Sequence, residues 1–289
     1  MTKTSIRFFK DKEVRAIWDD NKEKWFFSAI DIVGILNNEF DYTKTSNYWR
    51  WLKKQLKTKN SQLVSDTHRL KMTAADGKMR EVDVFDSDGI IKLAKAIPNP
   101  NIEFLDWFVY SEQTIDGQSK KKAYQFFESN LIKNNDIGKT KSLLQIHEYI
   151  FGGLYSFAGK IRTKNISKSG FMFANAMFLD KVLEEISNKK QNTFELVVEK
   201  YVEMNVAHPF MEGNGRSTRI WLDLILKKEL KKCIDWSKIN KTDYLQAMIL
   251  SHNDSSKITA LLKNALTDKI NDREMFIKGI DYSYYYEEE

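Results

Sequence analysis

Cysteine, proline and glycine are all scarce in this sequence, and each scarcity excludes a class of protein. One cysteine in 289 residues excludes an internal disulfide framework and a cysteine metal cluster. That residue, Cys233, lies in an apolar stretch that reads as helical, and we expect it to pack rather than react. Three prolines and twelve glycines argue against long disordered tracts.

Long apolar runs are also missing. No stretch approaches the roughly 18 uninterrupted apolar residues of a membrane helix, and residues 1–15 lack the apolar core of a secretory signal. We therefore expect a cytoplasmic protein with no membrane partner.

Apolar and aromatic residues are plentiful, at 42% and 13% of the chain. This is enough for packed cores, and the length favours two domains over one. The net charge of +6 is modest, so it supports nucleic-acid contact only where the basic residues cluster.

Residues 1–115 predict an α+β domain built from hairpins and helices. The segments Val14–Trp18 and Trp25–Phe27 flank a turn-forming Asp-Asp-Asn, which indicates a hairpin. Ser28 and Asp31 then fit a capping box at the start of a helix. A second hairpin is expected at Arg69–Phe85, around the strong turn signal Asp76-Gly77.

A basic stripe runs along the helix predicted near residues 45–57. One face of this helix is apolar, and the cations recur on another face at helical spacing: Arg50, Lys53, Lys54 and Lys57. Such a row can follow the phosphates of DNA, and on the pattern alone a solvated surface is the alternative.

Three segments of this half resemble a known domain: "EVRAIWDDNKEKWFFSAIDIVGIL", "NYWRWLKKQLK" and "HRLKMTAADGKMREVDVFDSDGIIKLAKAIP". They are similar to the Bro-N domain of phage antirepressor-type proteins, which is generally regarded as DNA-binding. The resemblance covers about the first 110 residues and favours DNA as a partner of residues 1–115.

A polar, lysine-rich stretch at residues 116–139 is predicted to be a linker helix region. Residues 140–289 then read as an all-α domain. The exception is Lys160–Met172, where Gly159 and Gly170 bracket a polar segment that predicts a short hairpin.

The segment 208–219 carries the chemistry, and its local structure can be predicted. Thr193 is a good N-cap for a helix that ends where His208 precedes Pro209. The next helix begins near Asn214 or Gly215. A helix start offers free backbone N–H groups and the positive end of the dipole, so it predicts a phosphate site.

The side chains around this helix start suit nucleotide chemistry. Arg216 and Arg219 are three residues apart, so two guanidinium groups can hold one polyphosphate. Glu212 can supply an oxygen ligand to magnesium, and His208 can take a proton from an attacking hydroxyl. Each feature alone is weak, but their conjunction within a dozen residues is specific.

The same segment, His-Pro-Phe-Met-Glu-Gly-Asn-Gly-Arg-Ser-Thr-Arg, is identified as the signature of the Fic family. The resemblance extends from about Lys141 to Glu289, through "LLQIHEYIFGGLYSFAGKIR", "NISKSGFMFANAMFL" and "YVEMNVAHPF". It implies a helical bundle in which Lys160–Met172 is a flap that pins a target backbone by strand addition. The implied catalytic residues are His208, Asn214 and Arg216, the implied metal ligand is Glu212, and the implied nucleotide-binding residues are Gly213, Asn214, Gly215, Arg216 and Arg219.

The activity implied by this resemblance is transfer of AMP from ATP to a hydroxyl on a protein, with magnesium. Two alternatives are a Fic-fold transferase using another donor or transferring a phosphoryl group, and a DNA-binding regulator with a non-catalytic Fic domain. The intact Gly-Asn-Gly-Arg segment favours AMP transfer. Some small bacterial Fic proteins modify type II topoisomerase subunits, which makes such a subunit one expected target.

The C-terminal segment, about residues 272–289, resembles an inhibitory helix of some Fic proteins, with the motif (Ser or Thr)-x-x-x-Glu-(Gly or Asn). Ser283 and Glu287 match the motif, whereas Glu288 departs from it. The resemblance implies that Glu287 pairs with Arg219 and blocks the γ-phosphate. The alternative is a solvated acidic tail. Tyr284 is a candidate for self-modification by a neighbouring copy, which would make the protein at least transiently a homo-oligomer.

Overall fold

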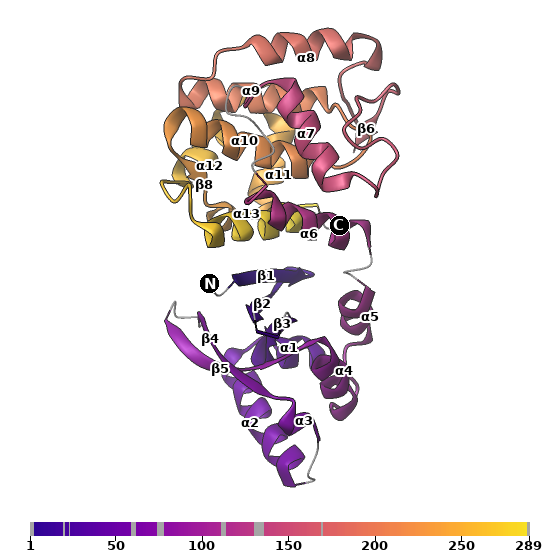
Figure 1. Cartoon of the computed structure of the whole chain (residues 1–289), viewed down its shortest axis with the longest axis vertical. Coiled ribbons are helices and arrows are strands. Elements are labelled where there is room, and N and C mark those ends of the chain that lie inside the picture. Colours follow the sequence, from indigo (N-terminus) through magenta and orange to yellow (C-terminus); the bar gives the residue numbers. More distant parts are fainter. Residues whose placement is uncertain are drawn as a thin grey trace. The chain divides into compact units, whose positions relative to one another are not determined.

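The computed structural model describes residues 3–19, 21–22, 24–58, 62–73, 78–110, 114–129, 136–168 and 170–287. The chain separates into two compact units, Met1–Thr114 and Ile115–Glu289. Figure 1 shows that the first unit combines a sheet with helices and that the second is a bundle of helices.

Unit 1 contains a five-stranded antiparallel sheet with the order β1-β2-β3-β5-β4. Its strands are β1 (Lys3–Phe9), β2 (Lys12–Asp19), β3 (Lys24–Ser28), β4 (His68–Thr73) and β5 (Met79–Phe85). Both predicted hairpins are confirmed, as β2 with β3 and β4 with β5. The Asp76-Gly77 turn lies outside the described residues, and β1 was not predicted.

The helices of unit 1 are α1 (Ala29–Leu36), α2 (Tyr42–Thr58), α3 (Gln62–Ser65), α4 (Ser87–Ala96) and α5 (Ile102–Tyr110). Ser28 caps α1 by accepting from the Asp31 backbone N–H, as predicted. The Asp31 carboxylate does not complete the reciprocal box. It pairs instead with Arg15 at 2.6 Å, which ties α1 to β2.

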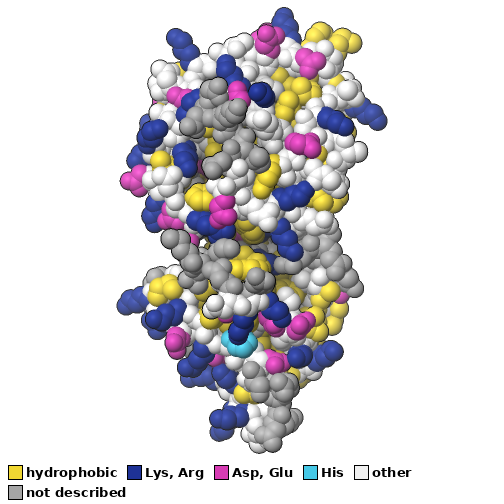
Figure 2. All heavy atoms as spheres, viewed as in Figure 1, with side chains coloured by type: hydrophobic (Ala, Val, Ile, Leu, Met, Phe, Trp, Pro, Cys, Tyr) yellow, Lys and Arg dark blue, Asp and Glu magenta, His cyan; other side chains and the backbone are white. Residues whose placement is uncertain are grey.

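The predicted stripe lies on α2, whose apolar face, Trp49, Leu52 and Leu56, is buried. Lys53 is only partly exposed and pairs with Asp83 of β5 at 2.9 Å. This pairing removes Lys53 from the row of exposed cations, whereas Arg50, Lys54 and Lys57 remain exposed. On the face in view in Figure 2, lysine and arginine side chains are interspersed with acidic ones.

Unit 2 is a bundle around the central helix α10 (Asn214–Leu230), which contacts α7, α9 and α13. The other helices are α6 (Ile115–Phe126), α7 (Thr140–Phe151), α8 (Leu179–Asn188), α9 (Phe194–Ala207), α11 (Lys241–Leu250), α12 (Ser256–Asn264) and α13 (Arg273–Tyr285). Trp221 of α10 and Tyr201 of α9 are among its largest fully buried side chains.

Two short hairpins interrupt the bundle. The predicted one is β6 (Ser167–Lys168) with β7 (Phe171–Met172), where Gly170 has φ +81°. The other, β8 (Cys233–Ile234) with β9 (Leu266–Thr267), was not predicted, so the helical reading around Cys233 is wrong. Burial raises the pKa of the Cys233 thiol to about 12, which leaves it protonated and unreactive near neutral pH.

Helix α6 lies in the stretch that the sequence predicts to be a linker. It packs against α7 and α13, and Ala123 and Phe126 on it are buried in the same core as the rest of the bundle. Within the described part of the chain, no helix is both long and apolar enough to cross a membrane.

Candidate active site

Residues of the loop between α9 and α10 close part of it locally. Thr193 caps α9, as predicted, and the helix ends at His208, which adopts a left-handed conformation with φ 48° and ψ 63°. The Asn214 side chain closes the loop by accepting from Phe210 N at 2.9 Å and donating to Phe210 O at 2.8 Å. Helix α10 begins at Asn214, as predicted.

Two glycines lie where other groups approach the helix start closely. Gly213 caps α10 with φ +80°, and a Cβ there would overlap the Phe151 ring. A Cβ on Gly215 would overlap the Glu287 carboxylate. The helix start is therefore open enough for an anionic oxygen to lie directly on the backbone.

His208 carries a neutral imidazole. Its Nδ1 lies 3.1 Å from Asn205 O, which assigns the proton to Nδ1 and leaves the Nε2 lone pair available. The ring stacks on Phe173 with 3.7 Å between centroids and 15° between planes. Burial lowers the pKa of His208 to about 4, so the ring is uncharged at neutral pH.

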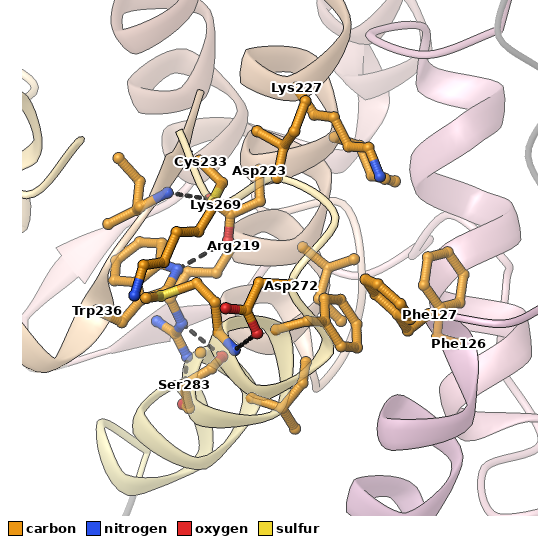
Figure 3. Close-up of a pocket in the computed structure, with 18 residues that line it drawn as sticks. Phe126, Phe127, Arg219, Asp223, Lys227, Cys233, Trp236, Lys269, Asp272 and Ser283 are labelled. Atoms are coloured by element: carbon orange, nitrogen blue, oxygen red, sulfur yellow. Dashed lines mark hydrogen bonds between the residues drawn. The ribbon is translucent and has the colours of Figure 1, made fainter. Parts of the chain in front are cut away.

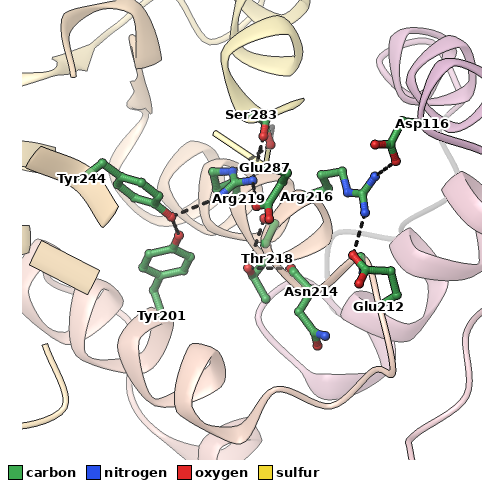
Figure 4. Close-up of polar contacts among 12 residues, drawn as sticks. Asp116, Tyr201, Glu212, Asn214, Arg216, Thr218, Arg219, Tyr244, Ser283 and Glu287 are labelled. Atoms are coloured by element: carbon green, nitrogen blue, oxygen red, sulfur yellow. Dashed lines mark hydrogen bonds and ion pairs between the residues drawn. The ribbon is translucent and has the colours of Figure 1, made fainter. Parts of the chain in front are cut away.

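Arg216 is buried and forked between two carboxylates. Only 4% of its side chain is exposed, and it pairs with Asp116 of α6 and, at 2.8 Å, with Glu212 of the loop. Figure 4 shows the guanidinium between these two carboxylates. The rings of Phe151 and Tyr284 lie 5.1 and 5.4 Å from it. Both carboxylates are more than half exposed, at 62% and 55%, so competing anions can reach this pair.

Arg219 is held mainly by the last helix. Its Nε donates to Ser283 Oγ and its Nη2 to Ser283 O, each at 2.7 Å, and Nη2 also pairs with the Glu287 carboxylate. Tyr244 accepts from Nη1 at 3.2 Å (Figure 4). Burial opposes ionisation of Glu287, but the Arg219 charge outweighs it and lowers the pKa of this carboxyl. Glu287 is therefore an anion lying over the start of α10.

Helix α13 is packed as a folded element, and the sequence alternative of a solvated tail does not describe it. Asp272 caps it, and Ile277, Ile280, Ser283 and Tyr284 are buried. Glu288 lies outside the described residues.

A cavity of about 100 Å³ lies between α10, α13 and the end of α6 (Figure 3). Gly279, Ile280 and Ser283 of α13 line it. On the opposite wall, the Asp223 carboxylate accepts from Ile234 N and Trp236 Nε1, each at 2.8 Å. Arg219 also lines this cavity, whereas His208 and Glu212 do not, so the cavity reaches the arginine end of the candidate site and not the histidine.

A match to a known protein family falls within the bundle. Residues 138–226 match the model of the Fic/DOC family. The chain contains a Fic domain. It is 29% identical over 173 residues to the protein adenylyltransferase VbhT of Bartonella schoenbuchensis. That match covers 52% of this chain but 36% of VbhT, so the chain spans about a third of the length of this curated relative.

Solved structures similar to this chain include BepC of Bartonella tribocorum with bound AMPPNP, at 18% identity and a TM-score of 0.46. The match covers 53% of this chain and 84% of that one. A cell filamentation protein of Bartonella quintana with bound ADP follows at 19% identity and 0.44, covering 53% and 83%. Fic-1 of C. elegans has 18% identity and a TM-score of 0.40, covering 62% and 53%.

Within the Fic domain, the predicted site residues come together around one helix start. His208, Glu212, Gly213, Asn214, Gly215, Arg216 and Arg219 all lie on the loop or the first turns of α10. Ser283 and Glu287 reach the same place from α13. The four stripe residues lie in unit 1 on α2.

Tyr284 is placed differently from the exposed acceptor that self-modification needs. Its hydroxyl donates to Ser119 Oγ of α6 at 2.9 Å, and 6% of the residue is exposed. Modification of Tyr284 stays a prediction, and it requires α13 to leave the bundle first.

The sequence did not predict a role for His147 of α7, which contacts the loop between α9 and α10. It is fully buried, its Nδ1 accepts from Gly159 N and its Nε2 donates to Glu212 O, both at 2.9 Å. Its ring stacks on Phe210 with 3.7 Å between centroids. Burial lowers the pKa of His147 to about 4, so a neutral imidazole connects α7 to the loop between α9 and α10. Its partners lie 12 and 65 residues away, and no local pattern marks it.

Proposed function

We propose that this chain is a protein adenylyltransferase, which transfers AMP from ATP to a hydroxyl of a target protein. The observation that carries the proposal is the convergence of a neutral histidine, a helix start that accommodates an anionic oxygen and two buried arginines at the start of α10. The name of the relative VbhT supports the reaction class.

The chemistry follows from the geometry of His208. The hydroxyl oxygen of the target attacks the α-phosphorus of ATP, and a phosphate ester bond forms. The bond from the α-phosphorus to the bridging oxygen breaks, and pyrophosphate leaves. Because Nδ1 is engaged with Asn205 O, Nε2 of His208 takes the hydroxyl proton.

The phosphates of ATP are proposed to replace carboxylates that already lie in the site. Carboxylates of Asp116, Glu212 and Glu287 hold the two arginines at present. Phosphate oxygens carry the same charge and accept the same forked hydrogen bonds. Backbone N–H groups of residues 213–215, at the positive end of α10, would bind the rest of the chain of phosphates.

Glu212 is the residue that fits a magnesium ion here. Its carboxylate is more than half exposed beside the glycines, and an oxygen ligand shared with phosphates and waters is the usual environment of this ion. No group of three or more metal-ligating side chains gathers within the described residues, so the nucleotide would supply the other ligands. Bound magnesium would neutralise charge on the phosphates.

The β6–β7 hairpin is proposed as the flap that aligns the target. Phe173 directly follows β7 and its ring stacks on His208, and Met172 at the end of β7 is 64% exposed. A target segment paired along this edge would present its hydroxyl to Nε2 of His208.

Glu287 is proposed to inhibit the enzyme as it stands. Its carboxylate occupies the space above Gly215 and pairs with Arg219. A γ-phosphate therefore cannot bind to the helix start or to this guanidinium. We therefore expect the intact chain to have almost no transferase activity until α13 moves.

Helix α6 holds the inhibitory helix in place. The buried Asp281 of α13 pairs with Lys120 at 3.0 Å and accepts from Tyr124. Tyr284 bonds Ser119 on the same face of α6. The cavity beside α13 is partly open to solvent, so this side of α13 is not fully covered by packed side chains. The docked helix is thus specifically held yet incompletely packed.

A different donor nucleotide is the second candidate, and a non-catalytic Fic domain is the third. The intact glycine segment and the two arginines support binding of a nucleoside triphosphate. They favour AMP transfer over both of these alternatives. A type II topoisomerase subunit remains a hypothesis for the target.

Arg216→Ala is expected to weaken ATP binding by roughly 10- to 100-fold, because it removes a charge-assisted fork worth about 1.5–3 kcal/mol. Isothermal titration with Mg·ATP in a Glu287→Gly background measures this. Lys228→Ala, which removes a cation from the last turn of the same helix, is the control and should bind normally. Equal affinities for all three proteins would contradict the assignment of Arg216.

Unit 1 is proposed to bind DNA through the exposed part of the α2 stripe. Since Lys53 is paired with Asp83, the exposed cations of the stripe that can follow phosphates include Lys54 and Lys57. Solvated surface remains the alternative, and the salt dependence of binding decides between them.

For the full chain, Lys54→Gln with Lys57→Gln is expected to lower the slope of log affinity against log salt by about 2, close to one unit per lost phosphate contact. Fluorescence anisotropy with a labelled duplex at several salt concentrations measures the slope. Lys53→Gln is the matched control and should change it much less. If the anisotropy of the labelled duplex does not rise even at low salt, the proposal is refuted.

A further inference from the structure

Arg162 is a buried cation that no part of the proposed reaction uses. It follows α7 and is 3% exposed. Its guanidinium donates to four backbone carbonyls, those of Lys164, Ala174, Ala207 and His208, at 2.7 Å for Lys164 and His208. Its backbone N–H donates to a fifth, Pro209 O, at 2.8 Å.

Two of these carbonyls belong to the end of α9, where a helix leaves its last carbonyls without partners. Arg162 Nη2 takes Ala207 O at 3.1 Å, and Nε takes His208 O. The adjacent Val206 O accepts from Ala174 N at 3.1 Å. A cation at this end also matches the negative end of the helix dipole, which offsets the cost of burying it.

The other two carbonyls belong to the two stems of the flap. Lys164 precedes β6 and Ala174 follows β7, so one planar fork holds both stems at once. The flap and the end of α9 are thereby joined through a single guanidinium.

His208 depends on this junction for its conformation. A left-handed conformation is strained for a residue other than glycine, so it persists only where the surroundings hold it. Arg162 holds the carbonyl of His208, and Phe173, the residue before Ala174, holds its ring.

We propose that Arg162 is a positioning residue, which fixes the His208 imidazole relative to the flap that aligns the target. This inference rests on the proposed function. It requires the planar fork of arginine, since a lysine ammonium has three donors on one atom and cannot span four carbonyls on two segments. Arg162 would affect the transfer step and leave ATP binding alone.

The test uses Arg162→Lys and Arg162→Gln in the full chain with Glu287→Gly. Transfer of label from α-labelled ATP to the proteins of a bacterial lysate is expected to fall about tenfold or more in both, and the affinity for Mg·ATP is expected to stay within about twofold. The His208 ring, assigned in NMR spectra by its loss in His208→Ala, should titrate closer to the ordinary value near 6.5 than to about 4.

Lys200→Met is the matched control, because Lys200 is also a buried cation on carbonyls, those of Ser187 and Lys189 at the end of α8. It should change neither transfer nor the His208 titration. If Arg162→Gln melts below the assay temperature, Arg162→Lys decides. Full transfer, or a His208 titration equal to that of the parent in a folded Arg162 variant, would overturn the proposal. Absence of transfer in the Glu287→Gly parent would refute the proposed function. The NMR titration of His208 would still test the positioning role of Arg162.

Discussion

Replacing His208 with alanine is expected to lower AMP transfer by about 100-fold or more, because a positioned general base contributes about 10²–10⁴-fold. ATP binding should persist, since the phosphates are bound by the start of α10 and its arginines and not by the imidazole. Label transfer and isothermal titration on the Glu287→Gly chain measure the two effects separately. His68→Ala in unit 1 serves as a control that removes a different histidine. Transfer that survives in His208→Ala would remove this residue from its role.

The pH dependence follows from the same residue. Burial lowers the pKa of His208 to about 4; Arg162 and Lys168 also disfavour its charged form, whereas Glu287 favours it. The base is active when unprotonated, so the rate is lost only as pH falls through the folded pKa. The rate of AMP transfer should therefore stay constant as the pH falls to 6.5. It should decline only well below pH 6.5. An acid limb centred near 6.5 would mean that the imidazole is solvated in the working enzyme.

Glu287→Gly is expected to raise transfer by at least about tenfold over the intact chain, because the carboxylate leaves both Arg219 and the space above Gly215. A buried charge-assisted pair is worth more than about 1.5 kcal/mol, which corresponds to this factor. Initial rates of label transfer at one ATP concentration, with the two proteins side by side, make the comparison.

The control for this change is Glu274→Ala, which removes an exposed carboxylate from the first turn of the same helix. It should leave the rate of the intact chain low. An equal rise in both variants would point to general loosening of α13, and an unchanged rate in Glu287→Gly would refute the inhibitory role.

Local features of this chain could be predicted because neighbouring residues determine them. Thr193, Pro209 and the glycines mark where α9 ends and α10 begins, and the helix start needs only those residues. The same reasoning found the β2–β3 and β4–β5 hairpins of unit 1 and the β6–β7 hairpin, although it missed the pairing of β1 with β2.

Contacts between distant segments could not be predicted. Asp116 meets Arg216 across 100 residues, and Arg162 meets His208 across 46. A single sequence holds no periodicity that links such positions. The stripe shows the same limit: Lys53 has the spacing of an exposed cation, but Asp83, 30 residues away, pairs with it.

The left-handed His208 shows how tertiary contacts decide a local conformation. The proline after it disfavours a helical conformation, which correctly predicts the end of α9. Whether the residue then extends or turns left-handed depends on Arg162 and Phe173, which come from segments more than 30 residues earlier in the chain.

The central claim is that the group transferred is AMP. Paired reactions of the Glu287→Gly chain with ATP labelled on the α-phosphate or on the γ-phosphate, in the same bacterial lysate, test it directly, with His208→Ala in that background as the blank. We expect His208-dependent protein-bound label from the α-labelled nucleotide and none from the γ-labelled one. Label from the γ-phosphate, or no His208-dependent label from either, would contradict it.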